Sequence, residues 1–414
     1  MAVDRRSIVK GALAATAAQA LRIPAAPAQA APMRVGFLTI KTGPLASGGL
    51  QMEQGLNVFF NQRNNMLAGR PVELHTADTG GNPAQARTKT QELVERLNVG
   101  VLIGPLAAFE ALAIDDYVRS SRTPILSVAG AEDMTQRKPN PWFVRPSCTS
   151  AQPSHPMADY AANELKYKRV ATIGDDFAFG HESVAGFHRV FEDNGGKVVQ
   201  KLWTPLNAPD YGTYISQLKT DIDAVFTAHA GSNGFKFIRQ LREYGNRTQI
   251  LGGFTPVDES LLQQMGDDAL GAMTGSWYSA ELDYPVNKTF VEAIRREYRL
   301  DPGVYAAETY VCGEVLEHAA KAVNGKIEDK DTFIKALREA KVPDTLRGPV
   351  RFDELGNAVG NIYIRKVEKK NGKYVNAVIK TYPDVSQFWT YGKDAFLKNP
   401  VYSRDYPPAK NLEQ

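Results

Sequence analysis

Residues 99–128 of the chain read VGVLIGPLAAFEALAIDDYVRSSRTPILSV and contain one complete strand–helix–strand unit. The aliphatic runs 99–103 and 124–128 predict buried strands, and the amphipathic stretch 109–122 between them predicts a helix. Two strands joined through a helix in this way normally lie parallel in one sheet. The unit therefore predicts an α/β fold in which helices cover a parallel sheet.

The same alternation continues on both sides of this unit and restarts after a break at Lys138-Pro139-Asn140-Pro141. Before the break, the pattern predicts further strands at 35–40 and 72–77 and helices at 51–66 and 83–97. After the break, it predicts strands at 169–173, 197–202, 224–228 and 249–251, and helices at 156–165, 182–194, 211–219 and 235–244. Two such sets in 414 residues predict two doubly wound parallel-sheet lobes, because one hydrophobic core rarely exceeds roughly 250–300 residues.

The last part of the chain becomes mainly helical and then ends in a hairpin. Helical patterns at 290–298, 306–323 and 331–339 precede two strand patterns at 361–367 and 374–379. The strands are joined by Lys370-Asn371-Gly372-Lys373, and an Asn-Gly pair is a strong signal for a two-residue hairpin turn.

The first thirty residues have the three parts of an export signal. Arg5, Arg6 and Lys10 form a basic start, a weakly apolar run follows at 11–21, and Ala28-Gln29-Ala30 is a small-residue cleavage site. We expect cleavage after Ala30 and a periplasmic mature protein. Residues 4–10 also resemble a twin-arginine export motif, with an ordinary basic start as the alternative.

Charge and cysteine content narrow the choice of partners. Removing residues 1–30 takes away four positive side chains and one negative one, so the net charge falls from +3 to zero. A neutral mature chain argues against nucleic acid or an anionic membrane as a partner. Cys148 and Cys312 are too few for a disulfide scaffold, and buried free thiols are expected, with a disulfide between them as the alternative.

Motifs for catalysis or metal binding are weak. His181 and His188 lie about two helical turns apart, too far to share one zinc ion easily. Residues 174–180 follow a strand as a phosphate loop would, but they lack its lysine and contain two aspartates. We therefore predict no metal, no cofactor and no enzymatic activity.

One hydrolase alternative remains. Residues 230–234 read AGSNG, which could place Ser232 on a nucleophile elbow between strand and helix. The only later histidine, His318, falls within a predicted helix. We favour a glycine-permitted turn whose serine and amides face a ligand, and a secreted serine hydrolase is the remote alternative.

Several predicted strands end where a helix begins, and these junctions predict the ligand site. In open parallel sheets, ligands bind outside the carboxyl ends of the strands, where free helix amides favour an anion. The junctions lie at 104–109, 128–131, 174–180, 229–232 and 252–255.

At these residues the chain resembles the leucine/isoleucine/valine-binding family of type I periplasmic solute-binding proteins, the ligand-capturing subunits of ATP-driven importers. The resemblance covers everything after residue 32. It rests on the order and spacing of Thr42-Gly43-Pro44-Leu45-Ala46 with Gly55, residues 78–86 (DTGGNPAQA), residues 101–105 (VLIGP), residues 143–146 (FVRP), and residues 348–353 (GPVRFD) with Gly356.

The resemblance implies two lobes joined by three crossings near Pro146, Ser279 and Phe352, which close on the ligand like a hinge. It places residues 33–146 and 280–352 in lobe 1, residues 147–279 and 353–390 in lobe 2, and a tail at 391–414. It also implies an inner-membrane ABC permease as partner, and we expect a monomer. A sensor that passes ligand occupancy to another protein is an alternative with the same fold.

Carried over to this sequence, the family's binding positions depart from an amino-acid site. Hydroxyl side chains are usual at the positions of Ala108 and Gly130, and an acidic residue that binds the ammonium group is usual at the position of Phe254. We expect the ligand at Ala107, Ala108, Phe109, Val128, Ala129, Gly130, Phe177, Phe179, Ala230, Gly231, Ser232, Phe254, Thr255 and Tyr278.

The ligand prediction follows from Phe254. Burying an ammonium group without an opposite charge costs several kcal/mol, so this site should reject α-amino acids. Its aromatic residues can instead form flat apolar walls. We predict a small aromatic or hydrophobic carboxylate, such as a benzoate or phenylpropanoid acid, with a branched-chain or other amino acid as the alternative.

Overall fold

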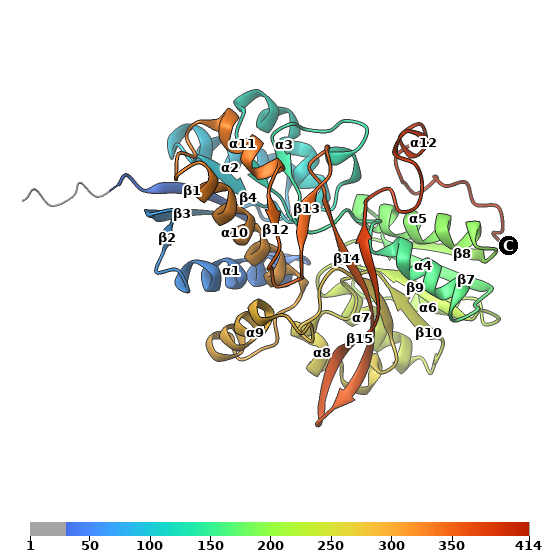
Figure 1. Cartoon of the computed structure of the whole chain (residues 1–414). Helices are drawn as coiled ribbons and strands as arrows, with labels where there is room; N and C mark the ends of the chain where they lie inside the picture. The colour runs from blue at the N-terminus through green and yellow to red at the C-terminus, as the bar shows by residue number, and fades with distance from the viewer. Residues whose placement is uncertain (1–29, 414) are drawn as a thin grey trace, which may run out of the picture.

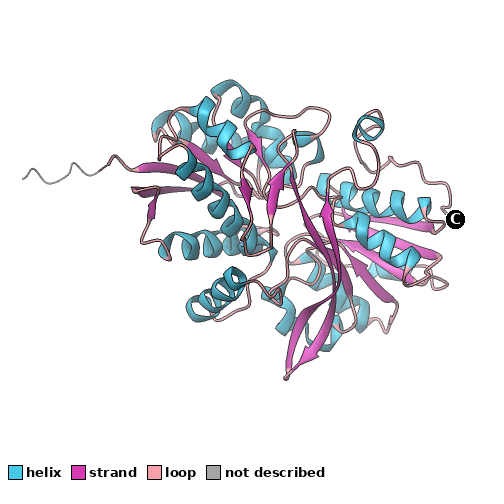
Figure 2. Ribbon diagram, viewed as in Figure 1, coloured by secondary structure: helices cyan, strands magenta, loops and turns pink. Residues whose placement is uncertain are grey.

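The computed structural model describes residues 30–413 and shows two α/β lobes with a long hairpin between them (Figure 1). Figure 2 shows the strands of each lobe flanked by helices. The predicted export signal lies outside the described residues, apart from Ala30. Within residues 30–413, no helix has both the length and the apolar character that crossing a bilayer requires.

Lobe 1 contains a six-stranded sheet in the order β2-β3-β1-β4-β5-β6. Its neighbouring strands run parallel except for the pair β2–β3. The elements are β1 (Met33–Thr39), α1 (Ala46–Asn61), β2 (Met66–Leu67), β3 (Arg70–Asp78), α2 (Pro83–Gln91) with a π-helical turn at Glu92–Arg96, β4 (Val101–Ile103), α3 (Ala108–Ser121), β5 (Ile125–Leu126), a 3₁₀ turn at Glu132–Thr135, and β6 (Phe143–Val144).

Lobe 2 contains a larger mixed sheet in the order β12-β13-β14-β11-β10-β9-β7-β8, with β15 paired to β14. Its first part comprises α4 (Ser154–Asn163), β7 (Arg169–Asp175), α5 (Ala178–Asp193), β8 (Lys197–Thr204), α6 (Gly212–Gln217), β9 (Ala224–Ala228), α7 (Asn233–Glu243), β10 (Gln249–Gly252), α8 (Glu259–Met265) with a 3₁₀ turn at Gly266–Ala269, and β11 (Met273–Ser276).

The chain then returns to lobe 1, where α10 packs along α1, before it re-enters the lobe 2 sheet. This part comprises α9 (Pro285–Tyr298), α10 (Val304–Ala322), α11 (Lys330–Arg338), β12 (Lys341–Val342), β13 (Val350–Phe352), β14 (Ala358–Lys370), β15 (Lys373–Val385) and α12 (Lys393–Leu397). The lobes are thus joined three times: between β6 and α4, between β11 and α9, and through β12 and β13 into β14.

The predicted parallel character holds for the strands β7 to β11 but not for the whole of lobe 2. Strand β14 pairs antiparallel with both β11 and β15. For β14 and β15 the reason is the Asn371-Gly372 turn between them, in which both residues have positive φ, 50° and 79°. A two-residue turn of this kind reverses the chain at once, so the two strands must be antiparallel.

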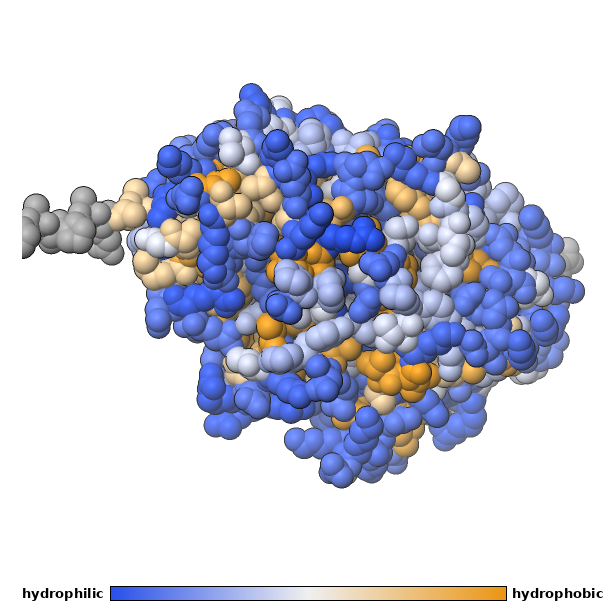
Figure 3. All heavy atoms as spheres, viewed as in Figure 1, coloured by the Kyte–Doolittle hydropathy of each residue, from blue (hydrophilic) through white to orange (hydrophobic). Residues whose placement is uncertain are grey.

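The remaining predicted features have clear outcomes. Cys148 and Cys312 are both buried free thiols, so no disulfide joins them in this structure. Phe396 and Tyr402, from the segment predicted as a C-terminal tail, form a small apolar cluster with Phe388, Ala151 and Ala185. The visible face of the molecule is mainly hydrophilic, with apolar residues exposed in small separate areas (Figure 3).

Candidate ligand-binding cleft

A cavity lies between the lobes at the junctions where the parallel strands end. It contains about 380 Å³ of space between protein atoms, of which the centre of a water molecule can reach about 30 Å³. Its walls are formed by Leu45, Leu106, Ala107, Ala108, Val128, Gly130, Phe177, Phe179, Ala230, Phe254, Thr255, Tyr305 and Glu308. Residues of both lobes contribute to these walls.

The structure brings nine of the predicted site residues together around this cavity: Ala107, Ala108, Val128, Gly130, Phe177, Phe179, Ala230, Phe254 and Thr255. The other five lie behind or beside its walls. Phe109 packs edge-on against Phe177, with ring centroids 5.6 Å apart. The carbonyl oxygen of Ala129 accepts a hydrogen bond from Arg145 Nε at 2.8 Å.

The remaining three predicted residues do not line the cavity and instead support the surrounding structure. Gly231 donates its N–H to Tyr305 Oη at 3.1 Å and has a positive φ of 56°. A side chain there would collide with Pro44, because its Cβ would lie 2.6 Å from the carbonyl oxygen. Ser232 is the N-cap residue of α7. The ring of Tyr278 is fully buried against Trp277 and Phe290 instead of lining the cavity.

The N-terminus of α3 provides the part of the site suited to an anion. Ala107 is its N-cap residue, and the amides of Ala108 and Phe109 in the first turn have no intrahelical acceptor. Glu110 lies in the same turn and accepts a hydrogen bond from the Ala107 N–H at 3.3 Å. Burial raises the pKa of Glu110 to about 7, which weakens the negative charge at this helix end near neutral pH. The helix dipole therefore favours a carboxylate beside Ala108.

Gly130 leaves no room for the hydroxyl side chain that amino-acid binders have at this position. A Cβ on Gly130 would lie 2.5 Å from Ser150 Oγ and 2.9 Å from Ser150 N. The close approach is fixed by a hydrogen bond from the Ser150 N–H to the Gly130 carbonyl at 2.9 Å. An anion at this position would therefore meet backbone groups and not a residue 130 hydroxyl.

A continuous row of aromatic rings forms the wall contributed mainly by lobe 2. Beyond the Phe109–Phe177 pair, the centroids of Phe177 and Phe179 are 6.0 Å apart, and those of Phe179 and Phe254 are 5.6 Å apart at an interplanar angle of 82°. Edge-to-face pairs of this kind fix ring orientation. The row presents flat apolar surfaces to the cavity.

Helix α10 contributes two cavity residues that the sequence patterns missed, Tyr305 and Glu308. Their positions in a strongly helical run gave no separate signal, and only the packing of α10 along α1 brings them to the cleft. Glu308 is 2 % exposed and is the one carboxyl side chain among the described residues of the cavity wall. Leu45 and Leu106 also belong to the wall and were not predicted.

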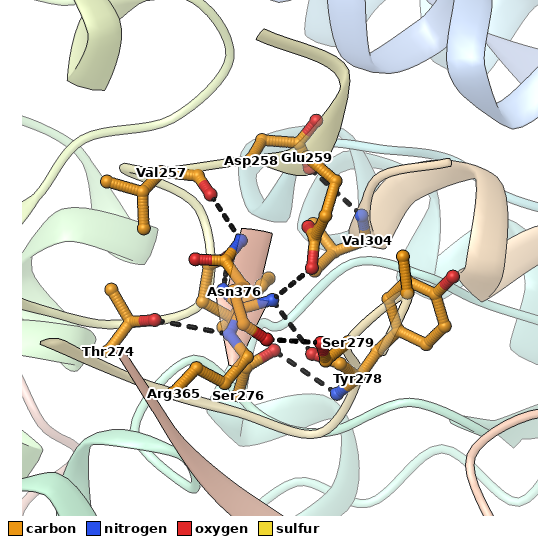
Figure 4. A network of polar contacts seen from close by, with 12 residues as sticks. Val257, Asp258, Glu259, Thr274, Ser276, Tyr278, Ser279, Val304, Arg365 and Asn376 are labelled. Atoms are coloured by element: carbon orange, nitrogen blue, oxygen red, sulfur yellow. Dashed lines mark hydrogen bonds and ion pairs between the residues drawn. The ribbon is translucent and has the colours of Figure 1, made fainter. Parts of the chain in front are cut away.

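Hydrogen bonds between the lobes hold the cleft in its present shape. Besides the Gly231–Tyr305 bond, Asp258 of lobe 2 accepts a hydrogen bond from the Val304 N–H at the start of α10, at 2.9 Å (Figure 4). It also accepts one from Gln51 Nε2 at 3.2 Å. Asp258 thereby contacts the helix that carries the cavity residues Tyr305 and Glu308.

The geometry does not assemble the hydrolase alternative. The ring nitrogens of His229 are hydrogen-bonded to Thr204 and Thr227, at 3.2 Å and 2.6 Å. His318 is exposed on α10. Neither imidazole is placed by a hydrogen bond beside Ser232.

Two α/β lobes that meet around a small cavity define the class of bilobal solute-binding proteins. The chain belongs to the periplasmic binding protein family, whose model matches residues 32–373. It is 28 % identical to a Leu/Ile/Val-binding protein homologue of Brucella abortus, over 89 % of this chain and 96 % of that protein.

Two solved structures are similar to this chain in both sequence and fold. One is an ABC-transporter solute-binding protein of Rhodopseudomonas palustris BisB5 in complex with 3,4-dihydroxybenzoic acid, with 31 % identity, a TM-score of 0.82, and coverage of 86 % of this chain and 98 % of that chain. The other is a solute-binding protein of R. palustris HaA2 in complex with p-hydroxybenzoic acid, with 26 % identity, a TM-score of 0.79, and coverage of 86 % and 98 %. The predicted family and fold class are confirmed.

Proposed function

We propose that this substrate-binding protein captures a small aromatic carboxylate by hinge closure and delivers it to an inner-membrane ABC permease. The observation that carries the proposal is the composition of the interlobe cavity. The α3 N-terminus offers amides for a carboxylate, and Phe177, Phe179 and Phe254 offer aromatic surface for a ring. Export with cleavage after Ala30 belongs to the same proposal.

The electrostatic character of the cavity favours, as ligand, a carboxylic acid that carries no ammonium group. Phe254 occupies the position at which the family's amino-acid binders place an acidic residue. Burial raises the pKa of Glu308 well above its usual value, which favours the neutral form of this carboxyl. An α-ammonium group would then have no opposite charge, at a cost of several kcal/mol.

The two R. palustris proteins support the same ligand class, since each was solved with a hydroxylated benzoic acid. A branched-chain amino acid is the second candidate. It is favoured by the name of the Brucella relative and by the presence of Glu308, which would have to ionise to pair with an ammonium group.

A thermal-shift screen of the mature protein tests the proposal. Aromatic acids at about 100 times their dissociation constant should add roughly 2.7 kcal/mol to the free energy of unfolding. Branched-chain amino acids, amides and sugars should leave the transition in place. Stabilisation by leucine or valine but by no aromatic acid would contradict the proposal.

Asp258→Asn should weaken binding of the best aromatic acid by disturbing the interlobe contact, while asparagine can still cap α8 through Ser260 N. One oxygen of Asp258 accepts from Val304 N and the other from Gln51 Nε2 and Ser260 N. An amide group would place N–H against one of these donors, which costs about 1–2 kcal/mol, or roughly 5- to 30-fold in affinity. Isothermal titration calorimetry measures the change.

The control is Asp267→Asn, which alters a carboxylate that accepts from Tyr374 Oη at 2.6 Å within lobe 2. It should bind the ligand as the wild type does. Equal affinities of the wild type and the Asp258 variant would show that the Asp258 contact does not contribute to closure.

A further inference from the structure

We propose that Glu308 selects the ring substituent of the ligand by hydrogen-bonding an aromatic hydroxyl, so that the preferred ligand is a hydroxylated aromatic carboxylate. This inference rests on the proposed function. It assigns a role to a second polar group of the same cavity, Glu308. The carboxylate end lies at α3, whereas Glu308 projects from α10, so the two groups approach the ligand from different helices.

The other polar side chains of the cavity are already hydrogen-bonded to protein groups. Thr255 Oγ1 donates to the His229 carbonyl at 2.5 Å. Tyr305 Oη accepts from the Gly231 N–H at 3.1 Å. Among the described residues of the wall, Glu308 alone presents a carboxyl group, and the rest of the wall is largely apolar. The Tyr305 hydroxyl can still donate its own proton, but its oxygen already accepts a hydrogen bond, so Glu308 is the main acceptor for a ligand hydroxyl beside α10.

The surroundings of Glu308 favour its neutral form over a negative charge. Burial raises its pKa well above the usual value, and nearby Asp258 raises it further. The Ser147 hydroxyl, Arg347 and Arg145 oppose this shift with smaller effects. A protonated carboxyl can both donate to and accept from a phenolic hydroxyl, and it does not repel a carboxylate bound in the same cavity.

An unsubstituted ring would place carbon atoms against the cavity side of Glu308, which would then keep only its contact with the Ser147 hydroxyl. A buried polar group that loses its partner costs enough to separate two ligands by about 10- to 100-fold. Benzoate should therefore bind about 10- to 100-fold more weakly than 4-hydroxybenzoate or 3,4-dihydroxybenzoate. The structure thus predicts that the site distinguishes ligands by whether the ring carries a hydroxyl group, and not by the size of the ring.

Calorimetric titration of benzoate, 4-hydroxybenzoate and 3,4-dihydroxybenzoate into the wild type and two variants tests the proposal. Glu308→Gln keeps a neutral donor and acceptor of the same shape, so the affinity ratio of hydroxybenzoate to benzoate should stay within about threefold of the wild-type ratio. Glu308→Leu removes both functions, so that ratio should fall to near one. Benzoate binding by the Leu variant shows that its pocket is intact.

Glu314→Gln is the matched control, because Glu314 is a buried acid on the same helix and does not line the cavity. It should leave the ratio unchanged. A wild-type ratio near one, or a Leu variant that keeps the wild-type ratio, would overturn the inference while leaving the proposed function intact. If the wild type bound leucine and Glu308→Gln lost that binding, Glu308 would instead be the partner of an ammonium group. Failure of every aromatic acid to bind would refute the proposed function itself.

Discussion

At pH 8, above the pKa of Glu259, Arg365→Met is expected to lower the free energy of unfolding by about 3–5 kcal/mol, because it leaves a buried carboxylate without its partner. Arg365 is 0 % exposed on β14 and donates to Glu259 Oε1 at 2.8 Å (Figure 4). It also donates to the carbonyl oxygens of Tyr278 and Phe254, at 2.8 Å and 3.2 Å. Chemical denaturation of the mature protein measures the loss.

The pH dependence of this loss identifies its cause. Burial raises the pKa of Glu259 to about 7, and Arg365 opposes that rise. Because the folded-state pKa lies above the unfolded value, this group's contribution to stability is complete at low pH and is lost as pH rises through the folded pKa. Removing Arg365 raises the pKa of Glu259 further, so the deficit of the variant should be smaller at pH 5 than at pH 8.

Two further variants complete the experiment. The double variant Arg365→Met with Glu259→Gln should recover much of the lost stability, since no unpaired charge remains. Arg351→Met on β13 is the control, because the side chain of Arg351 is 50 % exposed and pairs with Asp384 at the surface. Its effect should stay within about 0.5 kcal/mol. A double variant no more stable than Arg365→Met would contradict the buried-charge explanation.

Long amphipathic helices and alternating strands could be predicted from sequence, whereas short buried strands could not. The prediction of a strand at 224–228 coincides with β9, and the helix predicted at 109–122 differs by one residue from α3 at each end. Strands β6 and β11 were missed because they are short and buried throughout, so no alternation marks them. The hairpin of β14 and β15 was predicted from its Asn-Gly turn, but the antiparallel pairing of β14 with β11 was not predicted.

A similar physical reason decides which residues of the candidate site could be predicted from sequence. Residues at the ends of strands could be placed because parallel strands all present their carboxyl ends to one edge of a sheet. Nine of fourteen predicted residues accordingly lie on the cavity wall. Tyr305 and Glu308 could not be placed, because their approach depends on how α10 packs against lobe 1 after the chain has crossed twice. Tyr278 was predicted to face the ligand because it lies on a segment that crosses between the lobes, but its ring turns into the core instead.

Phe254 links the buried Arg365 network to the cleft, since its carbonyl oxygen is held by Arg365 while its ring faces the cavity. This residue should set the choice between an acid and an amino acid. 3-Phenylpropionate and L-phenylalanine differ only in the α-ammonium group, so they form a matched pair. The wild type should bind 3-phenylpropionate at least about 100-fold more tightly, because the ammonium has no opposite charge.

Phe254→Asp should weaken 3-phenylpropionate by at least about 100-fold, since it removes a buried ring worth roughly 1.5–3 kcal/mol and sets a carboxylate in the same cavity as the ligand's. The same aspartate would face an ammonium group favourably, so the preference for 3-phenylpropionate over L-phenylalanine should shrink or reverse. Phe254→Leu is the control for packing: it keeps the cavity apolar and should lower both affinities without narrowing their ratio. Titration calorimetry on the three proteins measures the ratios, with the thermal transition of each variant as the test of folding. If Phe254→Asp left the wild-type ratio unchanged, the position of residue 254 would not determine the charge of the ligand, and Glu308 would be the remaining group able to do so.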